Sequence, residues 1–450
     1  MSFESRTTAT TGLEVRPSAA RDERVTDCHD RRDVVARDPR GIMTEVSDVV
    51  VVGGGIGGAA LAFALAREGL GVTVLESTRE YEDRVRGESM HLWGLKEARE
   101  LGVEDVMLAA GAHVSPVWKQ YAEGVGEVGE IPMAMLVDGI PGTLNLRHPM
   151  ACQALADAAA AAGATIARGV RDVKVGRSSG SCAVSYVADG RVNDLTTPLV
   201  IGADGRASTV RKQAGITLER QEAIGYIAGL LVDGLEGVPD DHDVIAAEGD
   251  LFFLMFHQGG GRARAYLCPG LSGQHRFSGR QGTEQFLAAC ALSCYPWSDQ
   301  VAASSPAGPI ATYPGDDAWT PTPYAEGVVL VGDAAGHNDP IIGQGLSIAL
   351  RDARMVRDLV LEGARTPEAF APYGEERFTR MERLRFVADV MAVSQAEDAD
   401  NRSARRAFVG EKMAAMDPEI FGLFLGGFIG PETIPAELIQ PKLLDRIRAA

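Results

Sequence analysis

The clearest hydrophobic pattern in the chain is the run Val49–Val52, four β-branched residues that stand directly before a cluster of glycines. A short, continuous apolar run of this kind is typical of a strand that is buried on both faces. The small residues of 59–67 predict a helix, and residues 72–75 predict a second strand. Together these segments predict a strand–turn–helix–strand unit with a parallel sheet, so the expected fold class is α/β.

The hydrophobic pattern changes along the chain, and the changes predict how the chain is divided. Residues 217–320 hold apolar, strand-like runs and one helical segment, which predict a sheet. Residues 113–145 are expected to add strands to that sheet, for instance at 132–137. The predicted division is a discontinuous α/β domain, 43–216 and 321–375, interwoven with a β-sheet domain, 217–320, and followed by a helical C-terminal region, 376–450.

Two segments need a separate interpretation. Residues 1–42 are rich in Arg, Asp, Ser and Thr and lack an apolar stretch, so we predict a disordered extension rather than a secretory signal. The longest uncharged run, residues 49–66, reaches the lower limit for a membrane span, but it contains five glycines in six positions. A strand, a glycine turn and a helix explain this run better, and we predict no membrane span.

Composition narrows the function classes. The chain of 450 residues carries 44 Lys and Arg against 62 Asp and Glu, which gives a formal net charge of −18 and argues against nucleic-acid binding. Six cysteines are too few for a disulfide scaffold and are typical of a reducing compartment, so we expect a cytoplasmic protein. Cys290 and Cys294 are four residues apart without other clustered ligands, and no metal site is predicted.

The glycine cluster carries the first chemical signal. Residues 53–58 satisfy the pattern G-x-G-x-x-G between the predicted strand and helix. In such a turn Gly53 permits the tight bend, Gly55 lets the backbone approach a pyrophosphate, and Gly58 lets the helix pack closely on the strand. Glu76, at the end of the second strand, can accept hydrogen bonds from a ribose. The arrangement predicts a dinucleotide site but does not separate NAD from FAD.

Two later segments repeat the strand-to-loop pattern. The first strand ends at Asp204-Gly205, and the second ends at Gly332-Asp333, ahead of Pro340 and the glycines Gly343 and Gly345. An Asp at a strand end can hydrogen-bond a ribityl or ribose hydroxyl, and a helix that starts after Gly345 can hold its positive end near the N1–C2 edge of a flavin.

The three segments together resemble the class A flavoprotein monooxygenases, the para-hydroxybenzoate hydroxylase family. The resemblance rests on Gly53 to Gly58, on Asp204-Gly205 with Ser208 and Arg211, and on Gly332-Asp333 with Pro340 and Gly343-Gln344-Gly345. It implies a Rossmann-like FAD-binding domain, FAD as cofactor and NAD(P)H as reductant. Two departures affect finer flavin contacts: Gly336 stands where the family has His, and Ser347 where it has Asn.

The same resemblance implies roles for individual residues. Glu76 would bind the adenosine ribose, Asp333 the ribityl chain, and residues 343–345 would face the isoalloxazine ring. Val170 would offer its backbone to the adenine. The residues that the resemblance places at the cofactor are Gly53, Gly55, Gly58, Glu76, Arg86, Arg147, Val170, Asp204, Asp333, Pro340, Gly343 and Gly345.

Arg86 would face the flavin or the pyrophosphate, and Arg147 precedes a predicted helix, 149–162, at a point where the family also has an Arg. The family keeps its substrate under a sheet that roofs the flavin, here within 217–320. Pockets for apolar substrates are lined mainly by apolar side chains with a few polar groups. The candidate lining residues are Met90, Trp93, Phe256 and His257. No residue stands out as a catalytic base.

The resemblance implies an FAD-dependent monooxygenase. It would use NAD(P)H and O₂ to hydroxylate or epoxidise a hydrophobic, aromatic or polyketide-like small molecule through a flavin C4a-hydroperoxide. One alternative is a double-bond reductase of the geranylgeranyl reductase type, which Arg86-Gly87-Glu88 also resembles. A flavin-dependent halogenase is less favoured, because Trp93, Trp118, Trp297 and Trp319 form no Trp-x-Trp-x-Ile-Pro pattern. The substrate, the choice between NADH and NADPH, and the oligomeric state stay open.

Overall fold

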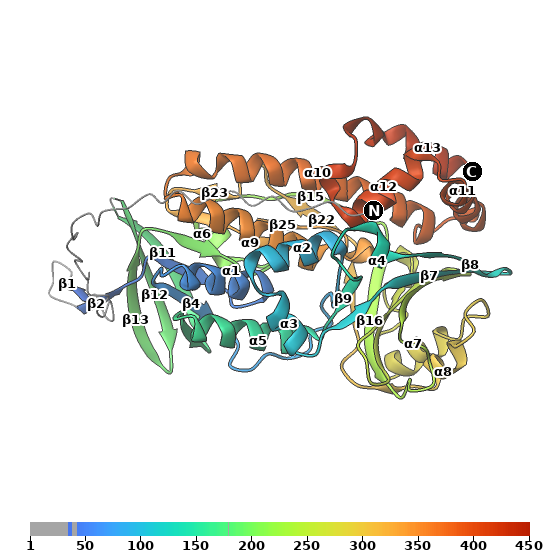
Figure 1. Ribbon diagram of the computed structural model, residues 1–450, viewed down its shortest axis with the longest axis horizontal. Coiled ribbons are helices and arrows are strands. Elements are labelled where there is room, and N and C mark those ends of the chain that lie inside the picture. Colours follow the sequence, from blue (N-terminus) through green and yellow to red (C-terminus); the bar gives the residue numbers. More distant parts are fainter. Residues whose placement is uncertain (1–34, 38–42, 179) are drawn as a thin grey trace, which may run out of the picture.

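A computed structural model of the protein describes residues 35–37, 43–178 and 180–450 (Figure 1). Most of the extension predicted over residues 1–42 therefore lies outside the described residues. Its residues Val35–Arg37 form strand β1, which pairs antiparallel with β2 (Met43–Val46).

The central sheet has six strands in the order β10-β4-β3-β14-β24-β23. All neighbours are parallel except the edge pair of β23 and β24. The strand bounds are β3 Val49–Val52, β4 Val72–Glu76, β10 Thr165–Arg168, β14 Val200–Gly202, β23 Tyr324–Ala325 and β24 Val328–Leu330. Every residue of β3 is buried, as the β-branched run predicts. The α/β fold class is confirmed.

Helices and a second sheet cover the two faces of the central sheet. On one face, α1 (Ile56–Arg67) packs against α5 (His148–Ala161) and α9 (Gly345–Leu361), and the alanines of α1 allow this close approach. On the other face, a five-stranded sheet in the order β1-β2-β13-β12-β11 packs its apolar side chains against the central strands. Its remaining strands are β11 Arg171–Ser178, β12 Ser181–Ala188 and β13 Arg191–Thr197.

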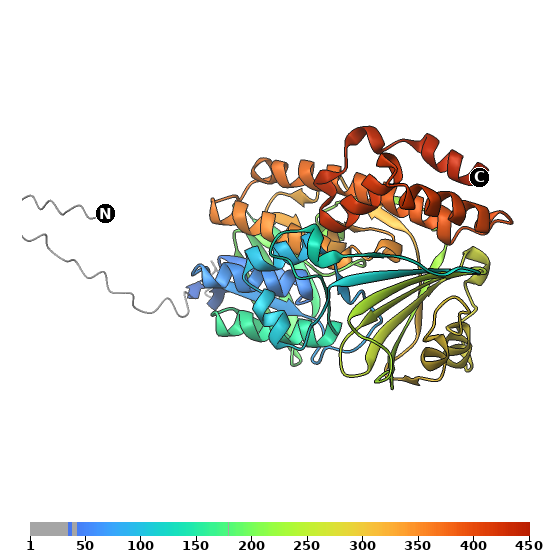
Figure 2. The ribbon, with the colours of Figure 1, turned by 45° about the vertical axis from the view of Figure 1, so that its right-hand side comes forward.

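A separate eight-stranded sheet forms the other half of the molecule (Figure 2). Its main path runs β20-β16-β19-β18-β17-β7-β8, with β21 paired to β16. The bounds are β7 Val117–Ala122, β8 Gly126–Ile131, β16 Tyr226–Asp233, β17 His242–Glu248, β18 Leu251–His257, β19 Arg262–Cys268, β20 Ser305–Pro306 and β21 Ala311–Pro314. The segment 113–145 adds β7 and β8, but the strand expected at 132–137 is wrong. Met133–Leu136 is the short helix α4, which follows Pro132 and buries Met133.

The two faces of this sheet belong to different cores, because side chains alternate along a strand. On β18, Phe253 and Met255 pack against α7 (Gly282–Ala289) and α8 (Ser298–Ala302). Phe252, Leu254 and Phe256 face the opposite way, into the larger core shared with the C-terminal helices. In Figure 2 the sheet lies between these two groups of helices.

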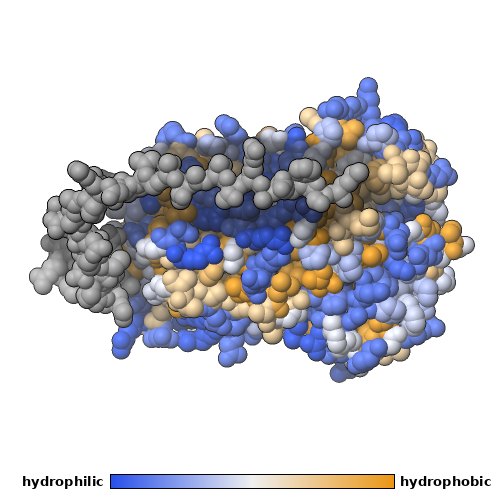
Figure 3. Space-filling model, viewed as in Figure 1, coloured by the Kyte–Doolittle hydropathy of each residue, from blue (hydrophilic) through white to orange (hydrophobic). Residues whose placement is uncertain are grey.

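The C-terminal region is helical: α10 Ala371–Gln395, α11 Arg402–Ala414, α12 Pro418–Ile429 and α13 Pro441–Ala449. Helix α10 begins five residues before the predicted start at 376, with Pro372 in its first turn, where a missing N–H breaks no helical hydrogen bond. Among the residues that the structure describes, no helix combines the length and apolar composition needed to cross a membrane. On the face shown in Figure 3, apolar residues lie among polar ones.

Candidate active site

A long cleft follows the carboxyl ends of the parallel strands β3, β14 and β24, where ligands of open α/β sheets bind. The glycine turn, Glu76 and Val170 line one part of it, and the loop after β24 lines another. Of the twelve residues predicted at the cofactor, eleven line this cleft and Arg147 does not: Gly53, Gly55, Gly58, Glu76, Arg86, Val170, Asp204, Asp333, Pro340, Gly343 and Gly345.

The glycine turn has the geometry that a dinucleotide requires. Gly53 has φ +104°, and a Cβ there would lie 2.3 Å from the carbonyl oxygen of Ala203. A Cβ on Gly58 would lie 2.0 Å from the carbonyl oxygen of Gly53. Nothing lies within 4 Å of the corresponding point on Gly55, so the backbone is open there. The N-terminus of α1 carries no side-chain cap, which leaves its N–H groups free for an anionic group.

The Glu76 carboxylate is fixed at the edge of the cleft. One oxygen accepts a hydrogen bond from the Gly54 amide at 2.6 Å, and the other accepts from the Thr78 amide and hydroxyl, each at 2.7 Å. The backbone of Val170 lies beside it, with its N–H donating to the Glu76 carbonyl at 3.0 Å. The ribose-binding and adenine-binding roles predicted for these two residues therefore fall at one end of the cleft.

Asp204 lines the cleft, but its carboxylate accepts hydrogen bonds from residues a few positions later in the chain. It accepts hydrogen bonds from the Ser208 hydroxyl at 2.5 Å, the Thr209 amide at 2.6 Å and the Val210 amide at 3.2 Å. These bonds hold the first turn of α6 (Thr209–Gln213). Direct contact of Asp204 with a cofactor stays a prediction, whereas its role in shaping the loop is visible.

A buried arginine hydrogen-bonds to the backbone of the loop that carries Asp333. Arg377, on α10, donates to the carbonyl oxygens of Gly332, Ala335 and Gly336 at 3.2, 3.1 and 2.9 Å. Its Nε also donates to Asp352 at 2.9 Å, and the Asp352 carboxylate accepts from the Gly332 amide at 2.8 Å. Burial opposes ionisation of Asp352, but the charges of Arg377 and Arg380 outweigh it and lower the pKa of this carboxyl.

Two arginines near the cleft take different positions. Arg86 lines both the cleft and the cavity described below. Arg147 does not line the cleft and its neighbour His148 does, so the cofactor contact of Arg147 stays a prediction. Arg147 has extended backbone at the start of α5, and its charge acts on Asp233, whose pKa is lowered mainly by Arg262 and further by Arg147.

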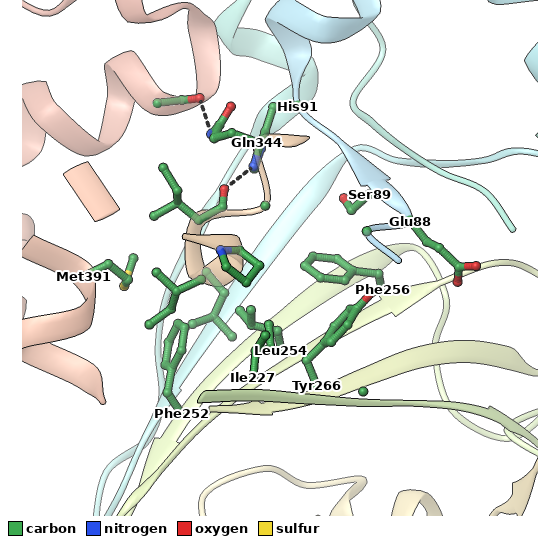
Figure 4. A pocket seen from close by; sticks show the side chains of 18 of the residues that line it. Glu88, Ser89, His91, Ile227, Phe252, Leu254, Phe256, Tyr266, Gln344 and Met391 are labelled. Atoms are coloured by element: carbon green, nitrogen blue, oxygen red, sulfur yellow. Dashed lines mark hydrogen bonds between the residues drawn. The ribbon is translucent and has the colours of Figure 1, made fainter. Parts of the chain in front are cut away.

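A second, smaller cavity opens beside the loop 340–345 and lies between the eight-stranded sheet and the C-terminal helices (Figure 4). It encloses about 1060 Å³ of empty space, open solvent at its mouth included. Its walls are largely apolar and come from β16, β17 and β18 on one side and from α10 and α12 on the other. The apolar lining residues include Val85, Trp118, Ile227, Ile245, Phe252, Leu254, Phe256, Ile341, Ile342, Val387, Met391, Phe424 and Phe428. The two hollows share Arg86, Gly87, Ser89, Arg206, Pro340, Gly343 and Gln344.

Of the four residues expected to line the substrate pocket, Phe256 does so and Met90, Trp93 and His257 do not. Met90 and Trp93 are fully buried in the core beneath the cavity, where the Trp93 indole donates to the Gln344 side chain at 2.9 Å. His257 follows Phe256 on β18 and therefore points to the other face of the sheet. For His257 and Met90 the reason is that neighbouring residues on a strand face opposite sides, whereas Trp93 lies on helix α2 (Leu92–Leu101) and packs into the core.

Comparison with known proteins identifies the family. The family described as "FAD binding domain" matches residues 46–386. A 6-hydroxynicotinate 3-monooxygenase of Bordetella bronchiseptica is 26% identical over 351 residues, which cover 76% of this chain and 90% of that protein. Squalene monooxygenase SE1 of Panax ginseng is 24% identical over 319 residues, and the match covers 70% of this chain but 58% of that protein's length. The solved structure of p-nitrophenol 4-monooxygenase PnpA from Pseudomonas putida DLL-E4 has the same fold, with a TM-score of 0.72, 18% identity and coverage of 86% of this chain and 98% of PnpA.

The chain belongs to the FAD-binding domain family. It is a class A flavoprotein monooxygenase, and FAD is its cofactor. The cleft fits this group: the open backbone at Gly55 leaves room for a pyrophosphate, and the loop after β24 carries Asp333 toward the same cleft. Within the described part of the flavoprotein, no three His, Cys, Asp or Glu side chains come together in a way that could hold a metal ion.

Several charged side chains near the apolar cavity of the flavoprotein are paired. Glu88 accepts hydrogen bonds from Arg264 at 2.9 Å, from the Gln258 side chain at 2.6 Å and from the His148 amide at 2.9 Å. Arg264 is fully buried and also pairs with Asp83 at 2.6 Å. Arg206 lies 3.5 Å from the Asp333 carboxylate. These pairings offset the charges of Glu88, Arg264 and Arg206 beside the cavity.

Sequence reasoning missed several residues of this cavity. His91 and Ser89 stand on alternate positions of β5 (Ser89–Met90) and its continuation, and this alternation was a usable signal. Trp118 comes from β7, and Met391 and Phe428 come from α10 and α12. No local pattern could connect these helices to the cavity, because their contact with it depends on how the C-terminal region folds back.

A buried polar group supports the Trp118 wall. The Trp118 indole donates to the Thr143 hydroxyl at 2.9 Å, and Thr143 is 3.0 Å from the Asp243 carboxylate. Asp243 also accepts from the Asn145 side chain at 2.7 Å and from the His257 amide at 3.2 Å. Burial raises the pKa of Asp243 to about 7, although these hydrogen bonds oppose the shift.

Asp243→Asn is expected to gain stability relative to the parent protein as the pH rises. Because the folded-state pKa lies above the usual value of 3.8, the stabilisation from protonated Asp243 is complete below about pH 4 and is lost as the pH rises through about 7. The amide copies the protonated form, so the difference in unfolding free energy should shift by about 2 kcal/mol in favour of the variant between pH 5 and pH 8. Urea unfolding of the FAD-loaded protein measures it. Asp189→Asn, whose side chain is 76% exposed, is the control and should show no such shift.

Proposed function

We propose that this flavoprotein hydroxylates or epoxidises an uncharged, largely apolar small molecule of aromatic or polyketide-like character, with NAD(P)H as reductant and O₂ as oxidant. The observation that carries the proposal is the apolar cavity that opens beside the flavin loop 340–345. The cavity is lined mainly by apolar side chains and by few polar groups, which is typical of sites for small lipophilic ligands. The 6-hydroxynicotinate, squalene and p-nitrophenol monooxygenases to which the chain is similar act on small organic molecules, as their names state.

The residues of the chain divide the work between the two hollows. Gly53, Gly55, Glu76 and the N-terminus of α1 would hold the adenosine and pyrophosphate parts of FAD, and Asp333 would hold the ribityl chain. When bound, FAD supplies the redox chemistry that takes electrons from NAD(P)H and delivers one oxygen atom of O₂. The apolar walls from β18 and α12 would orient the substrate and keep water from it.

The proposed reaction needs no charged base from the protein. Two tyrosines that line the cavity, Tyr266 and Tyr313, already use their hydroxyl groups in hydrogen bonds to the backbone. The Tyr266 hydroxyl donates to the Arg86 carbonyl at 2.9 Å, and the Tyr313 hydroxyl donates to the Arg84 carbonyl at 2.6 Å. An electron-rich ring or a double bond of the substrate would therefore react without help from a protein anion. A cytoplasmic location and a role in secondary metabolism are further parts of the proposal, and the low cysteine content supports only the first.

Isotopic oxygen tests the proposal. The FAD-loaded protein is supplied with NADPH or NADH, ¹⁸O₂ and a panel of uncharged aromatic and polyketide-like compounds. Products that gain one ¹⁸O atom, with one reductant consumed for each, support a monooxygenase. A product that gains two hydrogens and no ¹⁸O would instead support the double-bond reductase, and a halogenated product formed with added bromide or chloride would support the halogenase.

Leu254→Trp is expected to reduce product formation at least tenfold, because the indole fills space on the cavity side of β18. FAD content and the slow background oxidation of NAD(P)H should stay unchanged, since Leu254 does not line the cofactor cleft. Leu254→Met conserves the side-chain volume and should remain within about twofold of the parent protein. Equal product formation by all three proteins would show that the cavity is not the substrate site.

A further inference from the structure

Two polar side chains project from one short stretch of chain into the apolar cavity. Ser89 and His91 both line it, whereas Met90 between them is fully buried and does not. This is the alternation expected of extended backbone, in which residues two apart face the same side. Figure 4 shows both side chains beside the loop that carries Gln344. The polar end of the cavity is thus the end next to the flavin loop.

The hydrogen bond of His91 determines which ring nitrogen carries the proton. Nε2 lies 2.9 Å from the carbonyl oxygen of Ile342. A carbonyl oxygen can only accept, so Nε2 must be the donor in this pair. In a neutral imidazole the other nitrogen, Nδ1, is then a bare acceptor. The described residues provide no hydrogen-bond partner for Nδ1 or for the Ser89 hydroxyl, although both atoms are buried.

The surroundings of His91 keep the imidazole neutral. Its ring packs against Trp118 and Phe428, with ring centres 5.4 and 5.2 Å away. Burial lowers the pKa of His91 to about 4, and the hydrogen bond to Ile342 only partly offsets this effect. At neutral pH Nδ1 therefore remains an acceptor.

Apart from the Ser89 hydroxyl, several polar groups of the cavity are already engaged. Glu88 is held by Arg264 and Gln258, and the Tyr266 hydroxyl is bound to the Arg86 carbonyl. Both ends of the Gln344 amide are also used, by the Trp93 indole and by the Gly427 carbonyl, each at 2.9 Å. His91 Nδ1 is thus an uncommitted acceptor, and an acceptor that stays unpaired in an apolar site is costly.

We propose that the substrate carries a hydroxyl group at the end that enters next to the loop 340–345, and that this hydroxyl donates a hydrogen bond to His91 Nδ1. The inference rests on the proposed function, in which the cavity is the substrate site, and it narrows the substrate class to apolar molecules with a phenolic or alcoholic hydroxyl. His91 is then a specificity-determining residue, because a site built to bind a hydroxyl discriminates strongly against analogues that lack it.

Ligand binding without turnover tests the inference. The oxidised, FAD-loaded protein is titrated with 1-naphthol, 1-methoxynaphthalene and naphthalene, and binding is followed through the flavin absorbance spectrum. We expect 1-naphthol to bind about tenfold more tightly than either analogue. In His91→Phe the preference should fall to within about twofold, while naphthalene affinity stays close to that of the parent protein. His257→Phe is the control: this buried histidine lies on the other face of the same sheet and does not line the cavity, so its loss should leave the preference intact.

A second measurement does not depend on the folding of a variant. In protein labelled with ¹⁵N-histidine, 1-naphthol should shift the Nδ1 resonance of His91, and naphthalene should not. If the three ligands bind the parent protein alike and this resonance does not move, the hydroxyl inference is overturned while an apolar substrate remains supported. If none of the three binds, the proposed substrate class fails and the inference fails with it.

Discussion

Arg377→Met is expected to destabilise the folded protein by about 3 kcal/mol and to weaken FAD binding at least tenfold. Arg377 is 1% exposed and Asp352 is fully buried, so the substitution leaves a buried carboxylate with one of its two arginines missing. Loss of one partner from a buried ion pair is strongly destabilising, because the remaining charge has no water around it.

The effect on FAD follows from the three carbonyl oxygens that Arg377 holds, those of Gly332, Ala335 and Gly336. Without these bonds the loop that carries Asp333 can relax away from the cleft. Urea unfolding and titration of the apoprotein with FAD measure the two effects separately. Arg446→Met is the matched control, since Arg446 pairs with Glu419 at 2.7 Å but its side chain is 48% exposed, and it should change stability by less than about 1 kcal/mol. Unchanged FAD affinity in Arg377→Met would mean that the loop keeps its shape without the arginine.

The second large effect is expected at Gly58. A Cβ on Gly58 would lie 2.0 Å from the Gly53 carbonyl oxygen, which belongs to the backbone and cannot turn aside as a side chain could. Gly58→Ala should therefore separate the start of α1 from the glycine turn, abolish measurable FAD binding and lower the thermal unfolding temperature of the apoprotein.

Gly55→Ala separates cofactor binding from folding. At Gly55 the added Cβ meets nothing within 4 Å of the protein, so the apoprotein should unfold at an unchanged temperature. The methyl group would instead occupy space that the pyrophosphate needs, and FAD affinity should fall at least tenfold. FAD titration and thermal unfolding of both variants, made side by side, check the pair. Tight FAD binding by Gly58→Ala would contradict the close packing of helix and turn on which the prediction rests.

Local chemistry explains why the cofactor half was readable from the sequence. The run Val49–Val52, the glycines that follow and Glu76 lie within one β–α–β unit, and each satisfies a requirement of its own neighbourhood. The strand and helix predictions are confirmed there, apart from helix α1 beginning three residues earlier than expected, at Ile56.

Predictions from the sequence were weaker where the direction of a side chain depends on the strand register or on the conformation of a loop. His257 and Phe256 are adjacent and equally plausible as lining residues, but the pleat of β18 turns them to opposite faces. At the start of α5, His148 lines the cofactor cleft and Arg147 does not. A composition-based argument cannot separate such pairs, because the decision rests on the register of the strand or the bend of the loop.

By itself, the sequence determined the α/β fold class, the FAD cofactor and the loops that would hold it, since these depend on residues close together in the chain. Only the tertiary structure decided the substrate cavity. It packs α10 and α12, from the end of the chain, over strands such as β18 that lie more than 100 residues earlier in the sequence. Ser89 and His91 line the cavity that this packing leaves. The physical reason is that a cavity is the space left between packed elements. It therefore forms only when apolar faces that are distant in the sequence pack together.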